Sequence, residues 1–174
     1  MIYVLRKWIR KDDLRSVTAV IVLGSLCHFL YDWSGGLSLV ALFCPVNESV
    51  WEHLKLLYFP FLLVSLVSFR RSSPRPDLFF YSRFLGVLPA LLFILASYYT
   101  YTGILGRHFL LVDLILYVCS VFAAFAASSY FYRNLRRTPS VSGVVFLWIA
   151  LAFVFFIFTG FPPNLPLFFP PDIV

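Results

Sequence analysis

Charged side chains are scarce in this chain. Asp, Glu, Lys and Arg together make up 13% of its 174 residues, whereas 61% are hydrophobic and the mean hydropathy is +0.88. A soluble domain of this size normally carries about a quarter charged residues. The shortage of charge therefore excludes a soluble globular domain and predicts an integral membrane protein. At roughly 20 residues for each crossing, the length allows about five spans.

Familiar catalytic signatures are also missing. The chain contains no C-x-x-C, G-x-S-x-G, H-E-x-x-H, Walker or dinucleotide-binding motif. It has only three cysteines, so they cannot all pair with one another. Cys27 and Cys44 lie towards the same, oxidising face and could form a disulfide, while Cys119 lies in mid-span and is typical of a small apolar filler.

Long apolar runs are what the sequence does contain. They are too long for strands and lack the ten-residue alternation of an outer-membrane barrel, so the fold class expected is all-α, an integral membrane helical bundle. We expect one transmembrane domain over residues 1–174. Residues 1–15 alternate apolar and basic side chains and predict a short amphipathic interfacial helix, and 161–174 form a tail. The five predicted spans are about 17–33, 46–69, 79–101, 109–132 and 141–160.

The basic residues are distributed unevenly between the two sides of the predicted spans. Twelve of the fourteen lie in the N-terminal segment, between or beside spans two and three, or between spans four and five. Loops rich in Lys and Arg stay in the cytoplasm, which predicts a cell-membrane protein with a cytoplasmic N-terminus and an outer C-terminus. Anionic membrane lipids are the expected partners of these loops, and the net charge of +6 requires no nucleic acid.

Lys55, the histidines and four of the eight acidic residues gather in or next to the predicted outer halves of spans one, two and four. Charged groups within a span cost several kcal/mol unless they are paired or face a polar cavity, so a cluster of them indicates a functional site. This cluster includes all three histidines of the chain. Its members are His28, Asp32, Glu48, Glu52, His53, Lys55, His108 and Asp113.

Helical spacing brings several of these residues onto shared faces. His28 and Asp32 are four residues apart, and Glu48, Glu52 and Lys55 follow an i, i+4, i+7 pattern. We therefore interpret the cluster as one site built from three spans. The predicted metal ligands are His28, His53 and Asp113, and the predicted catalytic residues are Glu48, Glu52 and His53. The predicted supporting residues are Asp32, Asn47, Lys55 and Tyr101.

A structural interpretation of span two competes with the functional one. Ser49 and Glu52 match an S-x-x-E capping box, in which Asn47 or Ser49 would be the N-cap and the glutamates would offset the helix dipole. Lys55 would then only neutralise Glu52 or extend towards water. Both interpretations remain open from the sequence.

Three segments carry a resemblance to a known family. "GSLCHFLYDWSGG", "LFCPVNESVWEHLKLLYFP" and "YYTYTGILGRHFLLVD" resemble small multi-pass membrane proteins, mostly from Gram-positive anaerobes, that form a family of unknown function. The resemblance covers roughly residues 20–130 and supplies no activity. Cys44 stands where that family has serine, and His108 where it has asparagine. The family-motif positions that it implies are His28, Trp33, Asn47, Glu48, Glu52, His53, Tyr101, Gly103 and Asp113.

Two functions fit the predicted site. The first is an intramembrane enzyme, a hydrolase or transferase, in which a divalent metal such as zinc or an acid/base set acts on a lipid or lipid-linked substrate. The alternative is a protein that binds or transports a cation, a proton or a small molecule. The apolar inner halves of the spans favour the enzyme. As a third option, an accessory subunit would use the proline-rich tail as an extended arm for a partner.

The charge distribution makes the predicted topology testable. A cysteine introduced at position 164 should react with an impermeant thiol reagent added outside the cell, whereas one at position 74 should not. The reverse labelling pattern would contradict the predicted orientation and, with it, the outward-facing site.

Overall fold

A computed structural model describes residues 13–72 and 75–171, and these residues form helices and connections with no strand. Five of the helices are long and apolar enough to cross a membrane, which confirms the all-α membrane bundle expected from the sequence. The elements are α2 (Asp13–Trp33), α3 (Ser38–Phe43), α4 (Val50–Ser72), α5 (Pro76–Leu105), α6 (Leu110–Asn134), α7 (Val141–Gly160) and the short 3-10 helix η1 (Pro166–Phe168).

The third span is longer than predicted: α5 covers Pro76–Leu105, whereas the predicted span was about 79–101. α5 begins at Pro76, a residue that suits the first turn of a helix, and ends beside Gly106, whose positive φ of 70° closes the last turn. The short helix α3 was not predicted. The predicted interfacial helix lies mainly outside the described residues, since only 13–15 of it are described, as the start of α2.

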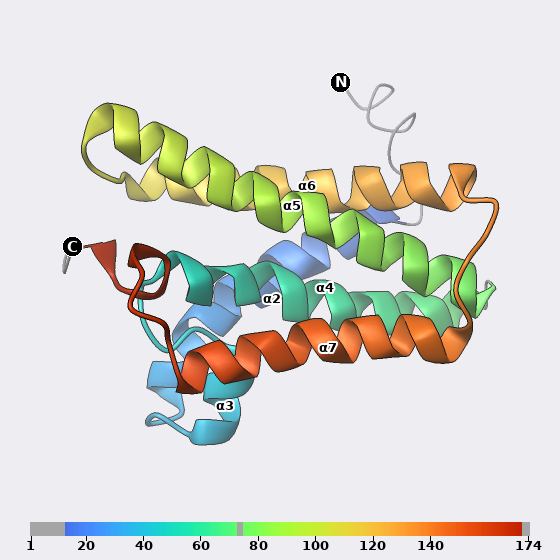
Figure 1. The fold of residues 1–174 in the computed structure, drawn as a ribbon, viewed down its shortest axis with the longest axis horizontal. Helices are drawn as coiled ribbons and strands as arrows, with labels where there is room; N and C mark the ends of the chain where they lie inside the picture. The colour runs from blue at the N-terminus through green and yellow to red at the C-terminus, as the bar shows by residue number, and fades with distance from the viewer. Residues whose placement is uncertain (1–12, 73–74, 172–174) are drawn as a thin grey trace.

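All five long helices run along the long axis of the molecule, so the bundle has two distinct ends (Figure 1). We call one the site end; it carries the α2–α4 connection, the α5–α6 turn and the C-terminal tail. The opposite end, the basic end, carries the α4–α5 and α6–α7 connections. α4 is the most buried of the spans, and the other helices surround it.

The interior is held together by large aromatic side chains. Tyr58 of α4 is fully buried, and its hydroxyl donates to the backbone carbonyl of Trp148 in α7 at 2.6 Å. The Trp148 indole in turn donates to the carbonyl of Phe80 in α5 at 3.2 Å. Buried tyrosine and tryptophan need a partner for their polar atoms, and here these partners connect three spans.

An ion pair fastens the basic end. The carboxylate of Asp13, at the start of α2, accepts a hydrogen bond from Arg83 of α5, and both side chains are buried. The Arg83 guanidinium also lies 4.6 Å from the centre of the Phe125 ring in α6. A buried charge is tolerated only when it is paired, and this pair joins the first and third spans.

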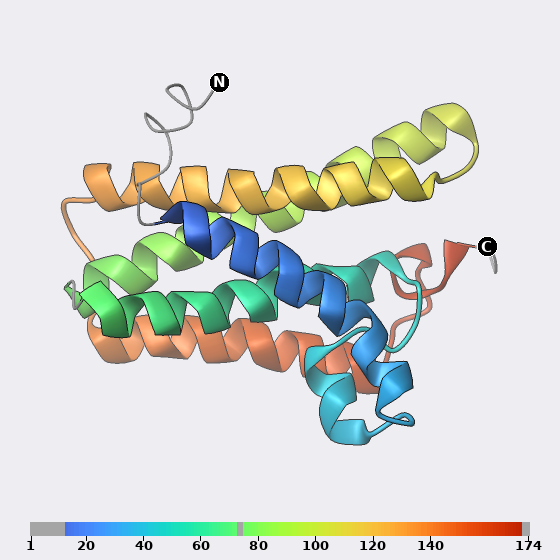
Figure 2. The same cartoon turned by 180° about the vertical axis from the view of Figure 1, so that it is seen from behind.

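α2 and α6 diverge towards the site end (Figure 2), and we call the angle between these two helices the wedge. At the narrow part of the wedge the Tyr117 hydroxyl of α6 donates to the carbonyl of Val20 in α2 at 3.0 Å. Gly24 makes this approach feasible, because a Cβ atom there would overlap the Tyr117 hydroxyl and the carbonyl oxygen of Leu56. Small residues permit such close helix contacts in membranes.

The C-terminal tail folds back onto the bundle as far as it is described. Phe168 of η1 is buried, and its ring centre lies 5.1 Å from that of Trp51 and 5.3 Å from that of Phe158. The described part of the tail is therefore packed against α4 and α7, and it does not project as the extended arm that the third functional option requires.

Replacing Gly24 with alanine should destabilise the bundle. The added methyl group must displace Tyr117 or separate α2 from α4, at a cost of about 1–3 kcal/mol. Thermal unfolding in detergent should show a lower midpoint for Gly24→Ala than for the parent. Gly103→Ala is the matched control, because a Cβ there meets no atom within 4 Å. Equal midpoints for the parent and Gly24→Ala would contradict the close approach.

Candidate metal centre

The segment that leads into α4 is fixed by a local cap. The amide of Glu52 donates to the Ser49 hydroxyl at 3.3 Å, and the amide of Ser49 donates to the Asn47 side-chain oxygen at 2.9 Å. Ser49 is therefore the N-cap of α4, as one interpretation of the sequence held. Glu52 does not complete the reciprocal capping box, because its carboxylate bonds elsewhere.

Glu52 and Lys55 form a buried ion pair inside the site end. Their charged atoms lie 2.7 Å apart, and the exposed fractions of the two side chains are 3% and 0%. The Glu52 carboxylate also accepts from the amide of Val46 at 3.0 Å and from the Thr159 hydroxyl of α7 at 2.8 Å. Lys55 donates to the carbonyl of Ala41 at 2.9 Å. The pair therefore joins α4 to α7 and to the connection before α4.

A disulfide between Cys27 and Cys44 fastens the same connection to α2. The sequence left this pairing open. Cys27 directly precedes His28 on α2, and the carbonyl of Cys44 lies 3.4 Å from the Lys55 ammonium nitrogen. The disulfide and the buried ion pair therefore hold together the backbone segments that carry His28 and Glu48.

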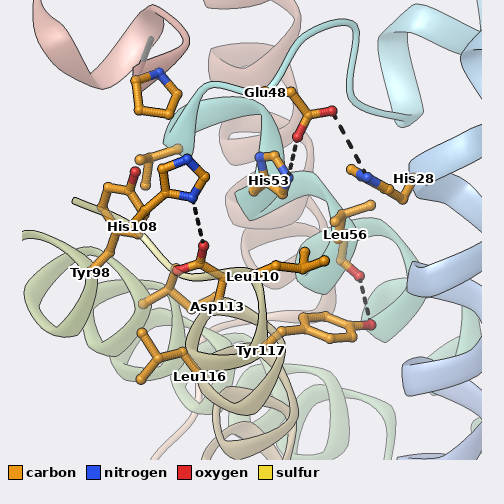
Figure 3. A pocket seen from close by; sticks show the side chains of 13 residues that line it. His28, Glu48, His53, Leu56, Tyr98, His108, Leu110, Asp113, Leu116 and Tyr117 are labelled. Atoms are coloured by element: carbon orange, nitrogen blue, oxygen red, sulfur yellow. Dashed lines mark hydrogen bonds and ion pairs between the residues drawn. The ribbon is translucent and has the colours of Figure 1, made fainter. Parts of the chain in front are cut away.

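His28, Glu48 and His53 meet at the site end (Figure 3). One Glu48 carboxylate oxygen lies 3.9 Å from Nε2 of His28, and the other lies 3.4 Å from Nε2 of His53. One candidate ligand atom from each of the three residues lies within 4.8 Å of the other two. Two imidazoles and a carboxylate are a common ligand set for zinc.

Hydrogen bonding orients the imidazole of His53. Its Nδ1 lies 2.8 Å from the carbonyl oxygen of Ser49, one turn earlier in the chain. When Nδ1 carries the proton and donates to this carbonyl, the lone pair of Nε2 points towards Glu48. Metal-binding histidines are usually oriented by such a bond from the second ring nitrogen.

Glu48 precedes α4 and is the most exposed member of the group, with 67% of its side chain accessible. In the metal-free state with His53 protonated, a hydrogen bond from its Nε2–H lowers the pKa of the Glu48 carboxyl below its ordinary value. Desolvation opposes this shift, and the charges of His53 and His28 reinforce it. The carboxyl is therefore ionised at neutral pH, which is the state that a metal ligand requires.

Asp113 lies across the pocket from this group. It accepts a hydrogen bond from the Tyr101 hydroxyl, and its second oxygen lies 3.3 Å from Nδ1 of His108. Tyr101 also accepts from the amide of Phe109 at 3.2 Å, which ties it to the α5–α6 turn. The structure thus places the predicted ligand Asp113 in a separate cluster of the same pocket, beside His108.

The pocket between the two clusters has a cavity volume of about 190 Å³. Its polar groups lie on opposite walls, and apolar side chains from α4, α5 and α6 line the space between and below them (Figure 3). Tyr98 and Tyr117 belong to the lining but were not predicted as site residues. In the sequence they are tyrosines within apolar spans, with no signal that separates them from an interfacial belt. The apolar lining includes Val50, Leu56, Ile94, Leu110 and Leu116.

Five predicted residues do not line the pocket, among them Tyr101, whose hydroxyl bonds to the lining residue Asp113. Glu52 and Lys55 are buried in their ion pair, and Asn47 holds the cap of α4. Asp32 is exposed at the end of α2, near the turn at Gly35. The structure therefore brings together His28, Glu48 and His53 from the predicted set and places Asp113 opposite them.

Comparison with known proteins identifies the family of the chain. The chain belongs to a family of unknown function (DUF6512), whose profile matches residues 1–172. The expected membership of an uncharacterised family is confirmed, while the expected Gram-positive source and the central motif stay predictions. No curated protein and no solved structure matches the chain.

The buried ion pair yields a stability prediction. Glu52→Gln leaves the Lys55 ammonium buried without its counter-charge, so we expect a loss of about 3–5 kcal/mol in the free energy of unfolding. The double variant Glu52→Gln with Lys55→Met removes both charges and should recover much of that loss. Unfolding in detergent measures both. If Glu52→Gln alone were as stable as the parent, the structural role of the ion pair would be contradicted.

Proposed function

Membership of this family assigns no reaction, and we propose that the chain is a zinc-dependent membrane hydrolase acting on a lipid or lipid-linked substrate. The observation that carries the proposal is the convergence of His28, Glu48 and His53 on the wall of a pocket between membrane-spanning helices. The three residues come from α2, from the connection before α4, and from α4 itself. Ionisable groups that cluster within or beside membrane spans usually indicate a functional site.

Three protein ligands leave one position of a tetrahedral zinc ion for water or substrate. The ion would supply an activated water and polarise the bond to be cleaved. The pocket lies beside the three ligands, so the substrate would approach from that side. Asp113 and His108 face this space from the opposite wall and are the groups that would transfer protons.

The walls of the pocket favour a substrate that is dissolved in the membrane. His28 comes from α2, Leu56 from α4 and Tyr117 from α6, and all three helices are candidate spans. The pocket is lined by residues of both α2 and α6, and these two helices diverge towards the site end (Figure 2), so a lipid would enter between them from the side. An aqueous substrate would not need such a lateral approach.

The proposed orientation places the site end outside the cytoplasm. The Cys27–Cys44 disulfide lies at this end, and disulfides are typical of oxidising compartments. Arg70, Arg71 and Arg133 lie in the last turns of their helices at the opposite end, which agrees with the positive-inside rule. The N-terminus would then be cytoplasmic and the C-terminus outside.

Cation or proton transport is the second candidate, because the same residues could bind an ion. Transport requires a polar route to the basic end. Below the pocket the Tyr117 hydroxyl bonds to Val20, and beyond this contact lies a core that includes Leu57, Phe61 and Val121. This closed apolar core favours hydrolysis over transport.

Metal analysis tests the proposal. Protein purified in detergent without chelator should contain stoichiometric zinc by mass spectrometry, and His28→Ala and His53→Ala should each lose it. His108→Ala is the matched control, since this histidine lines the same pocket outside the ligand group, and it should keep its zinc. No bound metal after reconstitution with divalent ions would refute the metal centre.

Zinc affinity should also depend on pH. Protons compete with the metal for the imidazoles, so affinity should fall as the pH drops through about 6.5, where unperturbed histidine protonates. Because the pKa of Glu48 is lowered, its carboxylate stays ionised through this range and should not add to the loss. Titration calorimetry at several pH values measures the effect. An affinity that is constant between pH 8 and about pH 5.5 would contradict histidine ligation.

A further inference from the structure

We propose that the bond cleaved is an acyl bond, in an ester or amide of a membrane-dissolved molecule, and that phosphate-bearing groups are not the substrates of this pocket. This inference rests on the proposed zinc site and narrows its substrate class. Two properties of the pocket carry it: the charges on its walls, and the size and polarity of the space between them.

Carboxylates supply the fixed charge of the pocket. Glu48 lies on one wall and Asp113 on the other, and none of the lining residues that the structure describes is Lys or Arg. Arg107 precedes the lining residue His108, but its guanidinium stacks 4.6 Å from the centre of the Phe109 ring. Enzymes that act on phosphoryl groups use cationic clamps to offset the charge of the phosphate oxygens.

Zinc alone does not provide such a clamp. With a divalent ion held by His28, Glu48 and His53, the charges of the ion, Glu48 and Asp113 would sum to about zero, so an incoming phosphodiester would meet the Asp113 carboxylate without a compensating cation. A carbonyl group is neutral, and a single Lewis acid is enough to polarise it. The charges of the pocket therefore favour an acyl group.

The size of the pocket sets how much of a substrate it admits. Its volume of about 190 Å³ corresponds to about six water molecules at roughly 30 Å³ each. The space beside the polar walls is lined by Leu56, Ile94 and Leu116, and Tyr117 closes it towards the basic end. It fits the cleaved group and a short apolar stretch, while the rest of the molecule would remain in the membrane.

The reaction that follows is simple hydrolysis. Water adds to the carbonyl carbon, the bond from that carbon to the leaving oxygen or nitrogen breaks, and the leaving group takes up the proton released by water. Asp113 and His108 lie where they would carry this proton across the pocket. The products are a carboxylic acid and an alcohol or amine, and no co-reactant besides water is needed.

Matched chromogenic compounds test the substrate class. Zinc-loaded protein in detergent micelles is assayed with para-nitrophenyl esters of increasing acyl length and with bis(para-nitrophenyl) phosphate, which share a leaving group. We expect ester cleavage that is absent in His53→Ala, with an optimum at short to medium acyl chains, and no phosphodiester cleavage above the His53→Ala background.

Variants of the apolar lining test the assignment of the pocket. Leu116→Ala and Ile94→Ala should each move the optimum to longer acyl chains, and Leu116→Phe should move it to shorter ones. For each methylene that the enlarged pocket newly accommodates, or that the smaller pocket excludes, kcat/KM for the corresponding ester should rise or fall about tenfold. Zinc content and elution on size exclusion verify that each variant is folded. An optimum that stays the same in all three folded variants would overturn the proposal.

The remaining outcomes separate this inference from the function on which it depends. Zinc-dependent cleavage of the phosphodiester at a rate equal to that of the esters overturns the acyl assignment and leaves the metal hydrolase intact. Bound zinc with no cleavage of any ester also overturns it. Absence of zinc refutes the proposed metal centre itself, whatever the esters show.

Discussion

The buried ion pair between Glu52 and Lys55 is the interaction on which the site end depends. Two charges withdrawn from water carry a large desolvation penalty, which only close pairing and further hydrogen bonds can offset. Here the further bonds come from the amide of Val46, the Thr159 hydroxyl and the carbonyl of Ala41. These bonds fix the position of the backbone segment before α4. Glu48 belongs to this segment, so its position is fixed as well.

Residues with different tasks alternate along the first turns of α4. Glu52 and His53 are neighbours in the chain, yet consecutive residues point about 100° apart around a helix. Glu52 therefore faces the interior and α7, while His53 faces Glu48 and the pocket. The polar motif at the start of α4 therefore both stabilises the fold and lines the pocket, because its charged groups lie on two different faces of the helix.

Under the proposed function, the wedge between α2 and α6 would give this polar end its access to the membrane. Helices in a bilayer gain little from hiding apolar surface, so contacts between them depend on close packing and interhelical hydrogen bonds. Gly24 and the Tyr117 hydroxyl provide such a contact at the narrow part of the wedge. Beyond it the two helices separate, and His28 and Asp113 line the space that opens.

The sequence by itself determined the membrane class, the five long helices and the gathering of the histidines at one end, since hydropathy and helix length are local properties. It pointed to His28 and His53 but named Asp113 as the third ligand, because spacing along the chain could not place Glu48 beside the two histidines. Only the tertiary structure decided that Glu48 joins them, that Asp113 pairs with His108, and that Glu52 lies inside. Spacing along a helix fixes which residues share a face, but the rotation of each helix and its distance from its neighbours arise from packing between spans.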